Sequence, residues 1–247
     1  MPQLSHVRVV DNLCSHFYTV YHHKMQERQT VVVYIDGFNL YRRSLEKRQG
    51  VKWLDLEKLS RNLLPDYEVV GVEYFTSNIK PTINQDPRAS MRQQIYLRAL
   101  ATIGPFLRIH FGQFRADKRY MPLVPQQVDP TTGELKKVAV LKIEEKGSDV
   151  HLAARMVADS ITGRCDVVVL LSNDSDHFHQ LEMLTKEYGR KVGLILPFLE
   201  TKRSSKQLRS LNLEFSREIT VEALKTSQFP SSLEDTVGRF TMPETWA

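Results

Sequence analysis

The sequence has little cysteine and no long apolar run. Its 247 residues include only two cysteines, Cys14 and Cys165, and neither belongs to a C-x-x-C pair. This excludes a disulfide framework and a cysteine-rich zinc site, and it suits a reducing compartment, so we expect a cytoplasmic protein. No stretch approaches the roughly 20 consecutive apolar residues that a membrane helix needs, so we expect no membrane partner.

The charge of the chain is only weakly biased. Lysine and arginine number 34 against 29 acidic residues, the net charge is +5, and 41% of the residues are hydrophobic. This apolar content is enough to bury a core, so the composition indicates a folded globular protein. The small basic excess permits a polyanionic partner without demonstrating one.

Apolar strands and helical periods alternate along the chain from residue 30 onward. Strands are expected at residues 30–35, 68–76, 107–111, 137–143, 166–171 and 191–196, and helices at residues 39–47, 56–64, 88–101, 148–161 and 176–188, with Ser148 as an N-cap. Residues 115–134 contain three prolines and are expected to form a loop. Short, continuous apolar strands between helices predict an α/β fold, a doubly wound, mainly parallel sheet with helices on both faces.

The chain divides into three segments. Residues 1–29 hold four of the eight histidines and lack an apolar period, which predicts an N-terminal extension. Residues 30–200 contain the alternating elements and are expected to form the domain. Residues 201–247 show few periodic features, so we expect them either to pack on the domain or to be partly mobile.

Aspartates lie where expected strands end. Asp36 directly follows the first strand, Asp174 and Asp176 follow the most apolar one, and Asp149 lies in the first turn of a helix at the same end of the sheet. Ligands of doubly wound folds bind at this edge, beyond the carboxyl ends of the strands. The capping preference of aspartate explains any one of these positions, but clustered carboxylates repel one another unless a cation neutralises them.

These carboxylates have the chemistry of a magnesium or manganese site. Hard oxygen ligands without cysteine or paired histidine favour Mg²⁺ or Mn²⁺ over zinc. In a basic protein, such an ion suggests phosphodiester hydrolysis, because it activates water and stabilises the charge that develops on the phosphate.

Three motifs carry a resemblance to a known family. They are YIDGFNLY at residues 34–41, EKGSDV at residues 145–150 and LSNDSD at residues 171–176. Together and in this order they resemble the signature motifs of the NYN domain family, a branch of the PIN-like ribonucleases. The resemblance runs from about residue 31 to the C-terminus and, as in a large bacterial subgroup, includes KWLDL at 52–56, RQQIYLRAL at 92–100 and SQFP at 227–230.

The resemblance implies a PIN-like, Rossmann-like fold and metal-dependent cleavage of RNA. Asp36, Asp149, Asp174 and Asp176 would then be the catalytic metal ligands, and Asn39 would orient a ligand or the scissile phosphate.

One departure from the family pattern concerns the number of metal ions. Many members place another acid one helical turn after the position of Asp149, whereas this chain has His151, Arg155 and Met156 in that stretch, and its next acid is Asp159. Catalysis with one metal ion, and a role without catalysis, therefore stay open.

Basic side chains offer contacts for phosphate. Lys146 lies beside the aspartate cluster, and Arg42 and Arg43 belong to a basic run on the first helix, so we expect these three to bind substrate. A second basic run consists of Lys202, Arg203, Lys206 and Arg209. Either run is equally compatible with a solvated surface.

Two histidines and two aromatic residues invite specific interpretations. His177 and His179 are two residues apart on a helix, so they face different directions and are not expected to share a metal, although one of them could transfer a proton. Trp53 and Tyr96 are expected in the core.

Three functions compete at this point. The first is a metal-dependent nuclease acting on RNA, and the second is an RNA-binding module that does not cut. The third comes from relatives in the same subgroup that are assigned as NADH-dependent monooxygenases of a small aromatic substrate, 6-hydroxy-3-succinoylpyridine. The sequence gives this reading little support, since it has no G-x-G-x-x-G after the first strand and no evident two-histidine, one-carboxylate iron site. A phosphatase with Asp36 as nucleophile is disfavoured, because Phe38 stands where a second aspartate is usual.

Overall fold

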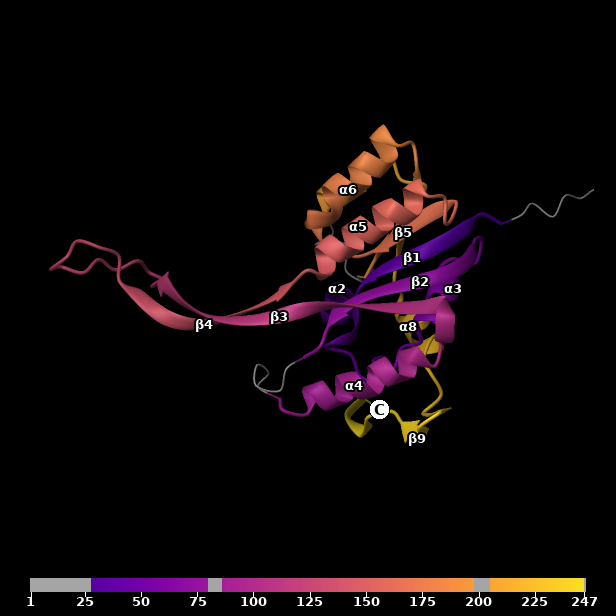
Figure 1. Cartoon of the computed structure of the whole chain (residues 1–247), viewed down its shortest axis with the longest axis horizontal. Coiled ribbons are helices and arrows are strands. Elements are labelled where there is room, and N and C mark those ends of the chain that lie inside the picture. The colour runs from indigo at the N-terminus through magenta and orange to yellow at the C-terminus, as the bar shows by residue number, and fades with distance from the viewer. Residues whose placement is uncertain (1–27, 80–85, 198–204, 247) are drawn as a thin grey trace, which may run out of the picture.

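The chain folds around one large sheet. The computed structural model describes residues 28–79, 86–197 and 205–246, so most of the expected N-terminal extension lies outside the described residues. Seven strands are hydrogen-bonded in the order β4-β3-β2-β1-β5-β6-β7 (Figure 1). They are β1 (Thr30–Asp36), β2 (Glu68–Ser77), β3 (Leu107–Pro122), β4 (Lys137–Lys146), β5 (Val167–Leu171), β6 (Lys191–Leu196) and β7 (Phe215–Glu218). Every neighbouring pair is parallel except β3 and β4.

Helical segments cover both faces of this sheet. The principal ones are α2 (Gly37–Leu40), which continues as a π-helical turn (Tyr41–Leu45), α3 (Leu56–Leu63), α4 (Ala89–Ala101), α5 (Ser148–Ile161), α6 (Phe178–Glu182), which continues as another π-helical turn (Met183–Glu187), α7 (Lys206–Arg209) and α8 (Val221–Thr226). In Figure 1, α5 and α6 lie on one side of the sheet and α4 lies on the other. The predicted doubly wound, mainly parallel fold is confirmed.

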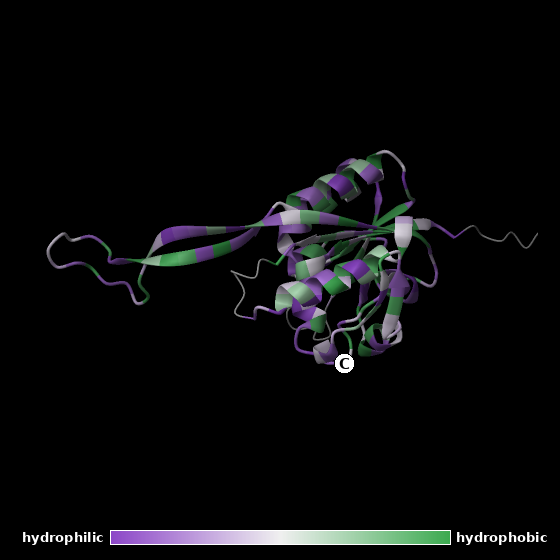
Figure 2. Ribbon diagram, turned by 60° about the horizontal axis from the view of Figure 1, so that its bottom comes forward, coloured by the Kyte–Doolittle hydropathy of each residue, from purple (hydrophilic) through white to green (hydrophobic). Residues whose placement is uncertain are grey.

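Alternation along β1 divides the core into two layers. Val31 and Val33 pack with buried residues of α3 and α4, whereas Val32 and Tyr34 pack with buried residues of α5 and α6. All five residues of β5 are buried, which is why that strand is a continuous apolar run rather than an alternating one. Figure 2 shows this contrast between hydrophobic central strands and helices of mixed hydropathy.

The strand order creates a crevice between β1 and β5. The chain proceeds from β1 to β2, β3 and β4 on one side, then returns through α5 to β5 on the other side of β1. The connections diverge from this point, which leaves the carboxyl ends of β1 and β5 uncovered. Asp36 ends β1, and Ser172 follows β5 directly.

The expectation of a loop over residues 115–134 is wrong in its first part. Strand β3 continues to Pro122 and pairs with β4 from Gln113 opposite Lys146 to Pro122 opposite Lys137. The two strands form a ribbon that projects away from the domain (Figure 1). The ribbon buries almost nothing, so residues 113–122 of β3 lack the apolar pattern by which buried strands are identified. The other strand of the ribbon, β4, includes the strand expected at residues 137–143.

The C-terminal segment contributes to the sheet and to the core. Strand β7 adds to the edge beside β6, and the strands β8 (Ser232–Asp235) and β9 (Gly238–Thr241) form a separate hairpin. Trp53 is 1% exposed, as expected, and its ring packs near those of Tyr96, Phe229 and Trp246. The Trp53 indole N–H donates a 2.8 Å hydrogen bond to the Pro230 carbonyl.

No helix within the described ranges is both long and apolar enough to cross a membrane.

The second basic run lies partly outside the described ranges, because residues 202 and 203 are not described. Of its remaining members, Arg209 pairs with Glu218 at 2.6 Å.

Candidate active site

The end of β1 presents a buried carboxylate. Asp36 is 7% exposed and caps the following turn, accepting a 2.9 Å hydrogen bond from the Asn39 backbone N–H at Oδ1. Gly37 is required beside it, because a Cβ there would lie 2.6 Å from the Phe75 carbonyl oxygen. The Asn39 side chain accepts a 3.1 Å hydrogen bond from the Asn173 backbone N–H, so it joins the ends of β1 and β5.

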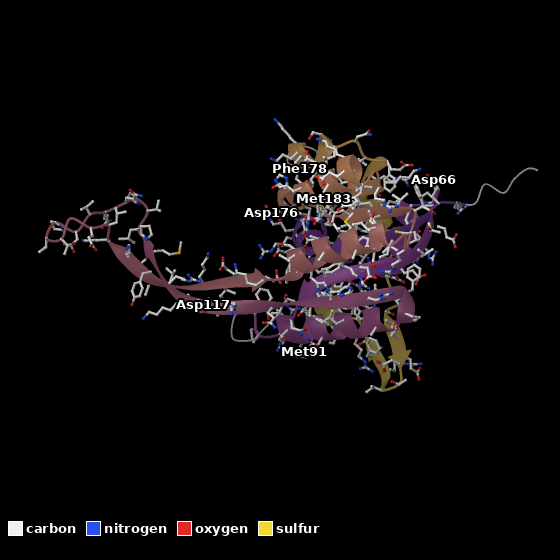
Figure 3. The ribbon with its side chains drawn as sticks, turned by 45° about the horizontal axis from the view of Figure 1, so that its top comes forward. Asp66, Met91, Asp117, Asp176, Phe178 and Met183 are labelled. Carbon is white, nitrogen blue, oxygen red and sulfur yellow. The ribbon has the colours of Figure 1, made fainter. Side chains whose placement is uncertain are left out.

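The residues after β5 support Asp36 and add a second carboxylate. The Ser172 hydroxyl donates a 2.9 Å hydrogen bond to Asp36 Oδ2 and accepts a 3.1 Å bond from the Asp174 backbone N–H. Asp174 accepts a 3.0 Å bond from the Asp176 backbone N–H, which starts a short 3₁₀ turn, Ser175–His177. The side chain of Asp176 is exposed and lies on the side of the domain from which the ribbon projects (Figure 3).

The start of α5 provides the third carboxylate. The N-cap of this helix is Gly147, with φ of 99°, rather than the expected Ser148; glycine adopts this left-handed conformation without a steric penalty. The Ser148 hydroxyl instead donates a 2.6 Å bond to Glu145. The turn places Asp149 in the first turn of the helix.

Three side chains converge in front of the sheet. One oxygen of Asp36, one oxygen of Asp149 and one ring nitrogen of His177 all lie within 4.8 Å of one another. Two ligands of one small divalent ion are about 3 to 4 Å apart, so small side-chain movements would allow all three to coordinate the same ion. Asp174 lines the same cleft but is not part of this group.

The surroundings of Asp36 and Asp149 disfavour the charged forms of both carboxyl groups. Burial raises the pKa of Asp36, and the hydrogen bonds from Asn39 and Ser172 oppose this shift without cancelling it. Partial desolvation raises the pKa of Asp149, and the nearby charge of Asp36 raises it further. A bound cation would relieve both effects, because it stabilises the charged form of each carboxylate.

His177 is the residue that sequence reasoning did not include in the metal site. His177 is 1% exposed, and its Nε2 lies 4.0 Å from Asp36 Oδ2. Among the described residues, this nitrogen has no hydrogen-bond partner. His179, two residues later, is exposed, so the prediction that the two rings face different directions is confirmed. The H-x-H pair drew attention to His177, but the sequence did not reveal its burial against Asp36.

A cleft of about 810 Å³ is lined by Asp36, Asp149 and Asp174, whereas the buried His177 is not among its lining residues. Arg42 and Arg43 also line the cleft, as do Phe114, Ile143 and Glu145 at the base of the ribbon. Lys146 does not line this cleft. It is exposed, and its Nζ lies 3.4 Å from Oε2 of Glu144.

Farther along α5, Arg155 and Asp159 belong to a separate, largely buried network. Arg155 Nε lies 3.4 Å from Asp159, and Asp159 accepts hydrogen bonds from the Tyr34 hydroxyl at 2.9 Å and from Arg164 at 2.5 Å. Arg164 also donates to Glu73, a fully buried residue of β2. This network joins the C-terminal half of α5 to β1 and β2.

Two further histidines lie near Glu73 without forming a metal site. Glu73 contacts His110 at 2.5 Å, and the rings of His110 and His151 are 4.7 Å apart at their centroids. The other oxygen of Glu73 accepts from Arg164, whose charge already neutralises the carboxylate. These three side chains are not a converging set of ligand atoms in the part of the chain that the structure describes.

The chain is similar to proteins of known sequence and structure. It is 29% identical over 191 residues to 6-hydroxy-3-succinoylpyridine 3-monooxygenase HspA of Pseudomonas putida, covering 70% of this chain and 61% of that protein, so it spans about three fifths of that relative's length. A protein of unknown function from Vibrio parahaemolyticus, VPA0982, matches with a TM-score of 0.49 and 16% identity, covering 81% of this chain and 98% of that one.

The family model of the NYN domain matches residues 30–217, which include β1 to β6, most of β7 and the three converging side chains. The fold is therefore nuclease-like, and the acidic group at its crevice is compatible with a divalent metal. The chain belongs to the NYN domain family.

Proposed function

We propose that this protein is a metal-dependent nuclease that hydrolyses phosphodiester bonds of RNA. The observation that carries the proposal is the convergence of Asp36, Asp149 and the unpartnered Nε2 of His177 at the crevice of a nuclease-like fold. Carboxylate oxygens beside an unsatisfied imidazole fit a divalent cation such as Mg²⁺ or Mn²⁺. When bound, such an ion activates water and neutralises the charge that develops on the phosphate.

The carboxylates have distinct tasks in this proposal. Asp36 and Asp149 hold the cation, and Ser172 fixes the orientation of Asp36 through its 2.9 Å hydrogen bond. Asp174 lies on the same cleft, where its carboxylate is available to the cation or to the attacking water. Asp176 is exposed and contributes mainly through its backbone N–H, which fixes Asp174.

Basic and aromatic side chains form the path for RNA. Arg42 and Arg43 line the cleft and provide positive charge for the phosphates on one side of the carboxylates. Asn39 holds the two strand ends together rather than presenting a free amide oxygen. Lys146 lies just outside the cleft, where it can contact a strand that leaves it.

One face of the ribbon extends this path. Residues directly opposite each other in an antiparallel pair share a face, so Phe114 and Ile143 at the cleft are followed along the same face by Lys118 and Tyr120, with Leu141 opposite Lys118. The Lys118 ammonium lies 5.5 Å from the centre of the Tyr120 ring. Aromatic rings that stack on bases and cations that contact phosphates are the elements of single-strand binding.

An RNA-cleavage assay tests the proposal. The purified protein should cut a labelled RNA when Mg²⁺ or Mn²⁺ is present and should lose this activity in the Asp36→Asn and Asp174→Asn variants. Asp66→Asn, which alters an exposed aspartate on the connection before β2, is the matched control. Activity that persists in both site variants would contradict the mechanism, and RNA binding without cleavage by the unaltered protein would favour a binding module.

A second candidate function comes from the relative described above. That relative is named a monooxygenase of a pyridine carrying a succinoyl group, and the cleft of this chain holds an edge-to-face pair of rings, Phe38 and Phe114, with centroids 5.6 Å apart. Arg42 and Arg43 line the same cleft and would pair with a substrate carboxylate. NADH oxidation that depends on 6-hydroxy-3-succinoylpyridine and oxygen, in a preparation free of flavoprotein, would establish this activity; its absence would leave the nuclease.

A further inference from the structure

We propose that the imidazole of His177 is a direct ligand of the metal at the Asp36 and Asp149 carboxylates, and that this nitrogen ligand makes the site select a first-row transition ion such as Mn²⁺ over Mg²⁺. The inference deepens the metal-dependent function proposed above and rests on it for the presence of an ion. It adds a ligand of a different chemical class from the aspartates that the sequence motifs indicate.

The burial of His177 is the first reason. A buried ring nitrogen without a hydrogen-bond partner is costly, because it has lost water and gained nothing in return. Nε2 of His177 is in this position, with the side chain 2% exposed. A metal ion is a partner that would satisfy it, since neutral imidazole is a common metal ligand.

The location of the ring is the second reason. His177 ends the short turn that begins after Asp174, so the same turn that places a carboxylate on the cleft brings the ring to within 4.0 Å of Asp36 Oδ2. Its ligand atom belongs to the group that spans no more than 4.8 Å. A ring nitrogen of His177 therefore lies close to both carboxylates, and the buried Nε2 lies near that of Asp36.

The donor set determines the ion. Mg²⁺ prefers oxygen ligands in a nearly ideal octahedron and keeps several waters, whereas imidazole binds first-row transition ions well. Two carboxylate oxygens with one imidazole nitrogen therefore favour an ion such as Mn²⁺ over Mg²⁺. A direct ion pair between protonated His177 and Asp36 is the competing arrangement, and it would leave an ion in the cleft bound through oxygen alone.

Pulsed electron paramagnetic resonance of the full-length protein loaded with Mn²⁺ separates these arrangements. We expect coupling to the ¹⁴N nucleus of a coordinated imidazole in the unaltered protein and in His179→Gln, whose ring is exposed, and its loss in His177→Gln. Bound Mn²⁺ without nitrogen coupling in the unaltered protein would overturn the inference. This signature is read on the unaltered protein, so it does not depend on the variant folding.

Metal titrations by calorimetry test the selectivity. We expect His177→Gln to weaken Mn²⁺ binding by at least about tenfold and to change Mg²⁺ binding by less than about threefold, with His179→Gln unchanged for both ions. Equal losses for both ions would contradict the selectivity. Nitrogen-coupled Mn²⁺ in a protein that cuts no RNA would uphold His177 as a ligand while removing the nuclease proposal, so the two failures are distinguishable.

Discussion

The hydroxyl of Ser172 donates a hydrogen bond to Oδ2 of Asp36 across 2.9 Å, although the two residues are 136 positions apart in the sequence. The same hydroxyl accepts from the Asp174 backbone N–H at 3.1 Å. One small side chain thus links the carboxylate at the end of β1 to the turn that carries Asp174 and His177. Ser172 is a positioning residue: it orients groups that would contact the ion without being such a group itself.

Replacing Ser172 by alanine should therefore weaken metal binding. Asp36 would keep only the hydrogen bond from Asn39, and groups that orient metal ligands typically contribute about 10- to 100-fold in metal affinity or activity. We expect the Mn²⁺ affinity of Ser172→Ala to fall by about tenfold in a calorimetric titration. Ser175→Ala, which changes an exposed serine of the same turn, should bind as the unaltered protein does; equal affinities for all three proteins would contradict the positioning role.

The sequence was sufficient to predict six of the seven strands of the sheet, β1 to β6, and the carboxylates at its edge, but not β7, which lies in the segment with few periodic features. Strands such as β5 are buried on both faces, so they are continuous apolar runs, and Asp36 follows such a strand directly. The structure indeed places Asp36, Asp149 and Asp174 on one cleft. The sequence was less informative about Asp176. Asp174 and Asp176 lie two residues apart in a turn, and their positions in the sequence do not reveal that the side chain of Asp176 is the exposed one.

The extension of β3 into the ribbon and the role of His177 could not be predicted, for two different physical reasons. The ribbon is exposed on both faces, so residues 113–122 carry no periodic signal of burial, and prolines favoured a loop. His177 is polar, and a polar residue in a turn is ordinarily solvated. Its burial arises from the tertiary packing of the turn after β5 against the end of β1, which no local pattern in the sequence reports.

The ribbon should contribute to RNA binding through one face only. We expect the double substitution Lys118→Ala with Tyr120→Ala to weaken binding of a single-stranded RNA by about tenfold, because stacking of one base on an aromatic ring is worth about 1 to 3 kcal/mol. Fluorescence anisotropy with a labelled oligonucleotide in EDTA measures this without cleavage. Met121→Ala, on the opposite face of the ribbon, is the control; equal losses in the two proteins would show that the face does not matter.

The buried network beneath α5 should make stability depend on acid pH. Burial disfavours the charged form of Glu73, but hydrogen bonds from His110 and Arg164 outweigh burial and lower the pKa of Glu73. A carboxyl with a lower pKa in the folded than in the unfolded state stabilises the protein above the unfolded value, and this contribution is lost as the pH falls through the folded value. The contribution of Glu73 is therefore complete at neutral pH and declines below about pH 4.5.

Glu73→Gln removes this contribution and leaves Arg164 without one of its charged partners. Breaking a buried ion pair costs about 3 to 5 kcal/mol, so we expect the variant to unfold about 6 to 20 °C lower at neutral pH. Thermal unfolding followed by circular dichroism from pH 7 to pH 3 should show the difference narrowing toward acid. Glu68→Gln, at the exposed start of the same strand, should melt at the same temperature as the unaltered protein at each pH. If the melting temperatures of Glu73→Gln and the unaltered protein differ by the same amount from pH 7 to pH 3, the linkage is refuted.

The carboxylates of the site should destabilise the metal-free protein. Partial desolvation and the charge of Asp36 raise the pKa of Asp149, so the folded state binds this proton more tightly than the unfolded state does. The contribution of Asp149 to stability therefore falls as the pH rises from the unfolded pKa through the folded one, and the charged group is unfavourable at neutral pH. Asp149→Asn removes that charge while keeping the shape of the side chain.

We expect the metal-free Asp149→Asn protein to melt slightly higher than the unaltered protein at pH 7, by no more than about 2 °C, because solvent screens a partly exposed group. Saturating Mn²⁺ should reverse the order, since an ion that binds only the folded state raises the stability of the protein that retains the ligand. Differential scanning calorimetry with EDTA and with Mn²⁺ measures both effects. Stabilisation of both proteins by Mn²⁺ to the same extent would show that Asp149 does not hold the ion.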